Sequence, residues 1–143
     1  MEQKNQTYKI INVILLESFF SRLSEINYSD PNFEVKTDVD FDTQNKENTL
    51  FVALTLEYLA GIKGNAQKEI SSHVKMLGIF EYSNSSKLSI EEFSNINAPA
   101  IIFPFIREHI ASISVKAGLN PILLPPINFV SLAEKKGKIK SSS

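Results

Sequence analysis

Apolar and polar residues alternate along much of the first half of the chain, most clearly in the segment Phe33–Asp42. Its odd-numbered positions are apolar or threonine, whereas its even-numbered positions are charged and mostly acidic. Successive side chains of a strand point to opposite faces of a sheet. We therefore expect a strand with one face on the core and an acidic face in water, as in an antiparallel sheet.

Three other segments have strand character. Tyr8–Phe20 is apolar on both alternating faces, which predicts a strand that is buried on two sides. Thr49–Ala60 and Glu69–Tyr82 each carry one continuous apolar face. The polar segment 43–48 and the glycine-containing turn at 61–65 separate these strands. Short connections between successive strands favour antiparallel pairing.

The pattern changes to a helical period after residue 88. Ser89 and Glu92 have the spacing of a capping box, which predicts a helical turn that reaches about Asn95. Apolar residues then recur at three- and four-residue intervals from Pro99 to Ala117, and Gly118 supplies a left-handed stop. We therefore predict an amphipathic helix over 99–117.

The remainder of the chain predicts an extended loop and a final helix. Three prolines prevent a regular helix over Leu119–Pro126, and Asn128 can cap a helix from Phe129 to about Lys136. Strands followed by helices predict an α+β fold, with a four-stranded antiparallel sheet and two C-terminal helices on one face. We expect one domain over 1–143, with disordered ends at 1–7 and 137–143.

Composition narrows the possible functions. The formal net charge of −1 gives no electrostatic reason to expect a nucleic-acid partner, and the absence of Cys excludes disulfides. We find no apolar run of about 18 residues and no signal-peptide pattern, so we expect a cytoplasmic protein that does not insert into membranes.

The chain offers little that could carry out catalysis. His73 and His109 lack the spacing of a zinc site, and neither a phosphate-binding loop nor a nucleophile elbow is present. We predict no enzyme activity, no metal and no cofactor. The ten Phe and four Tyr instead suggest that some apolar side chains line an oligomer interface or an exposed groove, for which Leu119–Phe129 is the best candidate.

Four motifs carry a resemblance to a known family. The chain reads FEVKTDVD at 33–40, LGIF at 77–80, FPFIRE at 103–108 and LPPINF at 124–129. In order and spacing these motifs resemble those of the SecB family of protein-export chaperones. The resemblance implies an ATP-independent holdase that keeps unfolded preproteins competent for the Sec pathway, as a homotetramer built from two dimers.

The resemblance also implies sites on this chain. The client groove would be lined by Val35, Thr37, Val39, Ile79, Phe80, Leu119, Leu123, Leu124 and Ile127. The oligomer interface is expected to use the helix residues Phe103, Ile106, Ile110 and Ile113. Shallow apolar contacts of this kind bind many sequences, because they require no specific hydrogen-bond partner.

The positions that dock the translocase motor SecA in the family are less similar in this chain than the four motifs. Proteobacterial members use a leucine and an acid on the strand before the glycine motif, where this chain has Ser71 and His73. The C-terminal end is rich in lysine instead of acids. Glu34, Asp38 and Asp40 could supply an acidic face in their place.

Two alternatives to the export role remain. The protein could be a solitary SecB-like chaperone for another client, such as the antitoxin of a toxin–antitoxin system. From a different class, it could be a small α+β protein that binds an apolar ligand, which would require a closed pocket with convergent polar groups.

Overall fold

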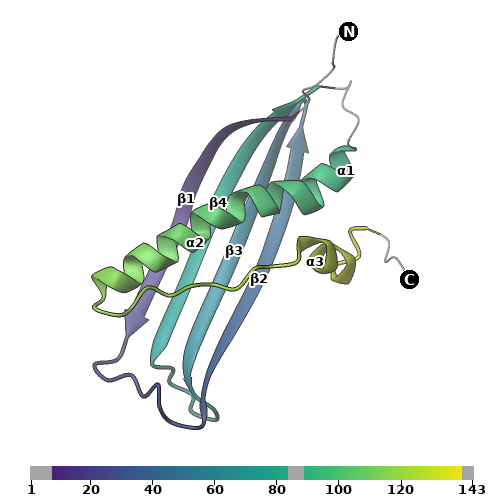
Figure 1. The fold of residues 1–143 in the computed structure, drawn as a ribbon. Helices are drawn as coiled ribbons and strands as arrows, with labels where there is room; N and C mark the ends of the chain where they lie inside the picture. The colour runs from purple at the N-terminus through teal and green to yellow at the C-terminus, as the bar shows by residue number, and fades with distance from the viewer. Residues whose placement is uncertain (1–7, 84–88, 140–143) are drawn as a thin grey trace.

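The sheet contains four antiparallel strands in the order β1-β4-β3-β2 (Figure 1). The computed structural model describes residues 8–83 and 89–139. The strands are β1 (Tyr8–Arg22), β2 (Phe33–Lys46), β3 (Thr49–Ile62) and β4 (Ile70–Tyr82). The helices lie on one face of this sheet, as the order of strands and helices predicted.

The hairpin between β2 and β3 is tighter than the polar segment 43–48 suggested. β2 continues to Lys46, which pairs with Thr49, and Glu47 adopts a positive φ of 58° in the turn. The predicted loop was therefore wrong. Polar side chains are tolerated there because β2 is an edge strand whose pairing with β3 satisfies the backbone.

The core forms between the sheet and the long helix α2 (Ala98–Lys116). Every second residue of β3 and β4 faces this core, as predicted from their alternation. On α2, Ile102, Ile106 and Ile110 are fully buried against the sheet. The helical spacing of these isoleucines predicted the face that packs on the strands.

Gly78 allows α2 to approach the sheet closely. A Cβ atom at this position would lie 2.7 Å from Cδ1 of Ile102, which is closer than real side-chain contacts allow. The glycine of the LGIF motif is therefore explained by packing, since a larger residue would force the side chain of Ile102, or the helix that carries it, to shift.

The prediction for β1 was wrong in one respect. Many of its apolar side chains are exposed, including Ile10, Leu16 and Phe19, instead of being buried on both sides. Irregularities in the register between Ile10 and Asn12 and between Leu15 and Glu17 exchange the two faces of the strand. Each bulge adds one unpaired residue, so a simple alternation cannot describe this strand.

The helical segment is longer than predicted. The helix α1 (Ile90–Glu92) and a π-helical turn at Phe93–Asn97 lead directly into α2. Ser89 accepts a hydrogen bond from the amide of Glu92 at 3.0 Å, which confirms half of the capping box. The segment Ile90–Lys116 has the length and apolar composition of a membrane span, but its buried isoleucines show that it is the core helix of this fold.

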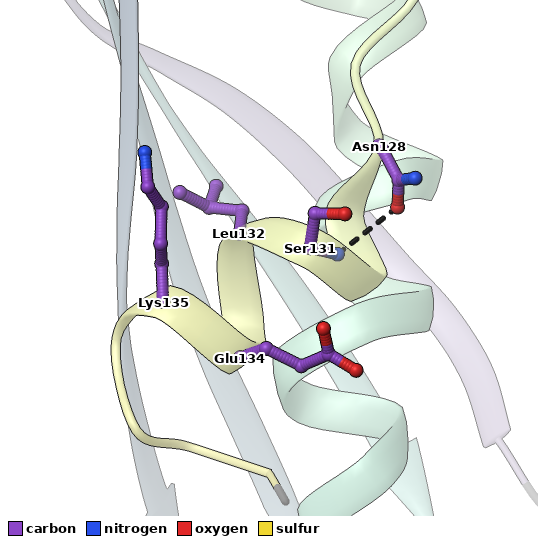
Figure 2. A pocket seen from close by; sticks show the side chains of 5 residues that line it. All are labelled: Asn128, Ser131, Leu132, Glu134 and Lys135. Carbon is purple, nitrogen blue, oxygen red and sulfur yellow. Dashed lines mark hydrogen bonds between the residues drawn. The ribbon is translucent and has the colours of Figure 1, made fainter. Parts of the chain in front are cut away.

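The chain after α2 crosses the sheet to the short helix α3 (Phe129–Lys135) (Figure 1). Gly118 has a φ of +80°, as expected of the helix stop. The side chain of Asn128 accepts a hydrogen bond from the amide of Ser131 at 3.0 Å and caps α3 (Figure 2), which confirms the predicted cap.

The ends of the chain were predicted to be disordered. Within the described part, the amides of Gly137 and Lys138 bond to the last turn of α3. Residues 1–7 and 140–143 lie outside the described residues, so the prediction for them stays open.

Candidate functional site

A cleft lies between β2 and the segment 120–125 that follows α2. Its volume is about 580 Å³ and it is open to solvent. The lining side chains come from β2, β3, β4, the β1–β2 connector and the proline-containing segment: Tyr28, Val35, Thr37, Tyr58, Ile70, Asn120, Pro121, Ile122, Leu123 and Pro125. Most of this surface is aliphatic or aromatic, so it suits apolar side chains.

The proline-containing segment is held in place by one hydrogen bond just before it and one within it. Arg22 donates from Nη1 to the carbonyl of Ala117 at 2.9 Å, which joins β1 to the end of α2. The amide of Ile122 donates to Oγ of the buried Ser114 at 2.9 Å. These contacts hold one wall of the cleft in a defined position before any ligand binds, which lowers the cost of ordering it on binding.

Alternation along this segment decides which side chains enter the core. Ile122 and Leu124 are buried, whereas Leu123 between them is 81% exposed at the cleft. An extended backbone directs neighbouring side chains to opposite sides, and the flanking prolines favour such a backbone. Leu123 is therefore held in water although a leucine would gain by burial.

Two tyrosines provide polar groups at the cleft. Tyr28 is exposed and its ring lies 5.3 Å from that of Phe33, whereas Tyr58 is mostly buried. Burial raises the pKa of the Tyr58 hydroxyl, so this group stays a neutral hydrogen-bond donor. An uncharged wall with few polar atoms favours contacts with apolar groups of many kinds over recognition of one specific ligand.

The nine residues predicted for the groove fall into three groups. Val35, Thr37 and Leu123 line the cleft. Leu124 and Phe80 lie in the core, and Val39, Leu119 and Ile127 pack against its edge. Ile79 points to the opposite face of the sheet from Phe80, because neighbouring residues of a strand alternate.

Three of the four predicted interface residues are covered by the rest of the chain. Phe103, Ile106 and Ile110 are buried within the chain itself, and Ile113 is half-buried. The same helix exposes a different row of apolar side chains, Ile101, Phe105 and Val115. The periodicity identified the apolar stripe of the helix correctly, but this stripe covers the sheet of its own chain.

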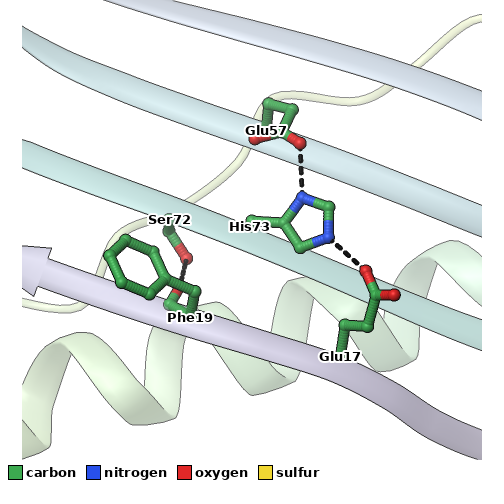
Figure 3. A network of polar contacts seen from close by, with 5 residues as sticks. All are labelled: Glu17, Phe19, Glu57, Ser72 and His73. Atoms are coloured by element: carbon green, nitrogen blue, oxygen red, sulfur yellow. Dashed lines mark hydrogen bonds and ion pairs between the residues drawn. The ribbon is translucent and has the colours of Figure 1, made fainter.

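The residues considered for partner docking lie on the sheet face away from the helices. His73 binds Oε1 of Glu17 through Nε2 at 2.6 Å and Glu57 through Nδ1 (Figure 3). The hydrogen bonds to Glu17 and then Glu57 raise the pKa of His73 above its ordinary value, and the bond to His73 lowers the pKa of Glu17. His73, which stands where the resemblance to proteobacterial SecB proteins would place an acid, is thus bound by two carboxylates.

The other docking candidates differ in their partners. Asp38 is exposed and pairs in register with Glu57, which extends the acidic surface to β2. Asp40 instead forms an ion pair with Lys136, which lowers the pKa of its carboxyl group. Glu34 lies 3.8 Å from Lys36, and Ser71 is half-buried on β4. Asp38 is therefore the least compensated acid of this set.

The arrangement supports binding and offers little for catalysis. Within residues 8–83 and 89–139, no three His, Cys, Asp or Glu side chains are grouped to hold a metal ion. Glu17 and Glu57 occupy opposite nitrogens of His73 and do not converge on one point. The cleft can accept an extended apolar segment through many shallow contacts.

Sequence reasoning missed several cleft residues, among them Tyr28, Tyr58 and Ile70. Tyr28 lies in the mostly polar segment between the predicted strands Tyr8–Phe20 and Phe33–Asp42, while Tyr58 and Ile70 belong to the apolar strand faces. The part of such a face that stays uncovered depends on where α2 crosses the sheet. The position of this crossing is set by contacts between distant residues, so no local sequence pattern reveals it. Tyr28, an aromatic residue in a mostly polar segment, was the signal in the sequence that could have identified this part of the cleft.

Comparisons with known proteins agree with this architecture. The family model described as "Preprotein translocase subunit SecB" matches residues 16–139. Protein-export protein SecB of Rickettsia bellii is 30% identical over 106 residues, which cover 74% of this chain and 68% of that protein. An uncharacterized protein of Methanocaldococcus jannaschii is 26% identical over 123 residues, 85% of this chain and 79% of that protein.

The fold is also similar to a solved chaperone structure. The SecB-like chaperone of Mycobacterium tuberculosis, in complex with a peptide from the HigA1 antitoxin, superposes with a TM-score of 0.66. The two sequences are 12% identical, and the match covers 85% of this chain and 91% of that chain. This similarity supports the SecB-like fold.

Proposed function

Because the chain belongs to the SecB family, it is a chaperone and not an enzyme, and we propose that it is an ATP-independent holdase for unfolded preproteins of the Sec pathway. In this proposal it keeps its clients extended until they are translocated. It works in the cytoplasm, where those clients are made.

The open cleft between β2 and segment 120–125 is the observation that carries the proposal. It combines an exposed Leu123 with apolar walls that the chain's own hydrogen bonds hold in place. A native protein buries its apolar residues and gains little from such a surface. An unfolded chain can place several of them there, so binding selects the non-native state.

A refolding experiment tests the proposal. Stoichiometric amounts of the protein should slow the refolding of a slow-folding preprotein diluted from denaturant, with no nucleotide present. Binding to the unfolded state lowers the concentration of chains that can fold. A requirement for ATP, or an unchanged refolding rate, would exclude the holdase mechanism.

A second candidate function keeps the cleft and changes the client. The similar chaperone of M. tuberculosis is bound to an antitoxin peptide, which favours a dedicated client of this kind. A toxin–antitoxin pair encoded beside the gene would then be expected, with an antitoxin that binds at least tenfold more tightly than an unfolded preprotein. Equal affinities would favour the export role.

We propose that SecA, if it is the partner, meets the sheet face that carries Asp38, Glu57 and Glu17. Asp38 is exposed and free of an ion pair among the described residues, so it would attract a basic partner. Titration with the C-terminal zinc domain of a cognate SecA tests this. Binding should weaken in Asp38→Asn, and should stay unchanged if the docking surface lies elsewhere.

A further inference from the structure

The connector between β1 and β2 is longer than its path requires. In the strand order β1-β4-β3-β2 these two strands are the outer ones, so residues 23–32 must cross the end of the sheet (Figure 1). Three strand spacings of about 4.8 Å amount to about 14 Å, whereas an extended chain of this length reaches roughly 33 Å. The connector is therefore slack, and specific contacts have to fix where its middle lies.

Backbone hydrogen bonds hold both ends of the connector. The amide of Leu23 donates to the carbonyl of Glu69 at 2.8 Å, and the amide of Lys63 donates to the carbonyl of Asn32 at 2.8 Å. Between these ends, Ile26 packs at the edge of the core. An apolar contact of this kind has no preferred direction, so it does not decide where the neighbouring side chains point.

The side chain of Glu69 holds the middle of the connector. Its Oε1 accepts a hydrogen bond from the backbone amide of Asn27 at 2.6 Å, and its Oε2 accepts one from Nδ2 of Asn27 at 3.1 Å. Two bonds from one carboxylate to the backbone and the side chain of one residue fix both its position and its direction. We name this pair of bonds the Glu69–Asn27 latch.

The carboxylate of Glu69 depends on Asn27 for its hydrogen bonds. Glu69 is only 5% exposed and forms no ion pair among the described residues. Arg22, which pairs with the adjacent Ile70, gives its hydrogen bonds to three backbone carbonyls instead. A buried carboxylate without a cation has lost hydration that only hydrogen bonds can replace. Closing the connector over Glu69 supplies these bonds, which favours the closed position.

The latch sets the position of Tyr28. This residue follows Asn27 directly, lines the cleft and is 58% exposed. Its ring lies 5.3 Å from that of Phe33, and within the described residues its hydroxyl forms no hydrogen bond that would hold it there. The backbone of Asn27 therefore decides whether the Tyr28 ring stays at the cleft or moves away with the connector.

We propose that Glu69 is a positioning residue for client binding, which acts through Asn27 to hold Tyr28 at the end of the cleft. This inference rests on the holdase function and adds how one wall of the client site is kept in place. Glu69 is buried and does not line the cleft, so it can act on a client only through the connector. With the latch open, binding would have to order this wall again, and the affinity would fall.

Exchanging the two latch partners tests the inference. The probe is a fluorescein-labelled twelve-residue peptide in which Val, Leu and Tyr alternate with Ser and Thr, measured by fluorescence anisotropy. Asn27→Asp sets two carboxylates against each other and should weaken binding at least fivefold. The double variant Asn27→Asp/Glu69→Gln again pairs one amide with one carboxylate, so it should bind within about twofold of the wild-type protein. The matched control Asn32→Asp changes an exposed side chain of the same connector that does not bond to Glu69, and its affinity should not change.

Tyr28→Ala separates positioning from a general loss of stability. If the latch acts through Tyr28, adding Asn27→Asp to Tyr28→Ala should weaken binding by less than about 1.5-fold, because the side chain to be positioned is already gone. The same fivefold loss in both backgrounds would show that the latch supports only the fold and would overturn the inference. A double variant Asn27→Asp/Glu69→Gln that binds as weakly as Asn27→Asp would overturn it as well.

Hydrogen exchange in the wild-type protein keeps the test decisive if Asn27→Asp does not fold. Relative to their intrinsic rates, the amide of Asn27 should exchange at least tenfold more slowly than that of Ser29, which has no backbone partner among the described residues. Adding the peptide should slow the exchange of Asn27 further, because contact with Tyr28 favours the closed connector. An unprotected Asn27 amide, or an exchange rate that the peptide leaves unchanged, would contradict the positioning role.

The outcomes separate this inference from the holdase function. If reduced, carboxymethylated α-lactalbumin binds the wild-type protein and Asn27→Asp with equal affinity, the holdase function stands and the role of Glu69 is wrong. If that unfolded protein does not bind the wild-type chain at all, the holdase function itself is wrong, and the role of Glu69 in client binding falls with it.

Discussion

His73 shows how a single residue can connect three strands of the outer sheet face. Its imidazole lies on β4 and binds Glu17 of β1 and Glu57 of β3 (Figure 3). Lys75 on the same strand pairs with Glu17, and Asp38 of β2 pairs with Glu57. Two carboxylates with one imidazolium favour the protonated histidine, which is why its pKa is raised.

This raised pKa predicts a dependence of stability on pH. A group whose pKa is higher in the folded state contributes stability that is fully present below its unfolded-state pKa of about 6.5 and is lost as the pH rises through the folded value. The loss of stability in His73→Gln should therefore be largest near pH 6 and shrink toward pH 9. Urea denaturation of both proteins measures it, and a difference independent of pH would contradict the assigned ion pairs.

The sequence predicted some single-residue roles and missed others. Ser89, Asn128 and Gly118 were identified because a cap or a stop depends on neighbours within four residues. The partners of His73 are 56 and 16 residues away. Only the strand order and register bring them together, so no local pattern could reveal them.

At the scale of the elements, the contact of α2 with the sheet depends on one glycine. Ile102 is fully buried over Gly78, where a Cβ would lie 2.7 Å from its Cδ1. Alternation and helical spacing predicted both surfaces, because each depends on a regular repeat. They could not predict the bulges of β1 or the π-helical turn before α2, since these break the repeat.

A double-mutant cycle tests this contact. Gly78→Ala should lower the free energy of unfolding by about 1–3 kcal/mol, because the added methyl group overpacks against Ile102 and forces its side chain or the helix to shift. Adding Ile102→Val removes the nearest methyl group, so the double variant should lose less than the sum of the two single losses. Denaturant titration gives all four values. A strictly additive cycle would show that Ile102 does not press on position 78.

At the scale of the whole molecule, the exposed apolar row on α2 bears on assembly. We propose that Ile101, Phe105 and Val115 contribute to a homotetramer, in place of the buried residues that sequence reasoning selected. Light scattering should give about 64 kDa, four times the chain's 16.1 kDa. A monomer at micromolar concentration would contradict this assembly.

Two neighbouring substitutions separate assembly from folding. Phe105→Asp places a charge on the exposed side of α2, so it should leave a folded chain of smaller mass. Ile106→Asp buries an uncompensated charge in the core and should unfold the protein, at a cost of several kcal/mol. Circular dichroism with light scattering distinguishes the two. An unchanged mass in Phe105→Asp would exclude that face from the interface.

The cleft exists only in the complete fold, because the strands, the β1–β2 connector and the segment after α2 all contribute to it. The most direct test of the account is the affinity for reduced, carboxymethylated α-lactalbumin, compared with native α-lactalbumin and measured without nucleotide. The wild-type protein should bind the unfolded form with micromolar or tighter affinity and should not bind the native form. Leu123→Asp should weaken binding at least tenfold, which corresponds to about 1.4 kcal/mol. The control Val130→Asp also places a charge on an exposed apolar residue, but this residue lies on α3 outside the cleft, so the affinity should not change. Equal binding of both forms, or full affinity in Leu123→Asp, would contradict the assignment of this cleft as a client site.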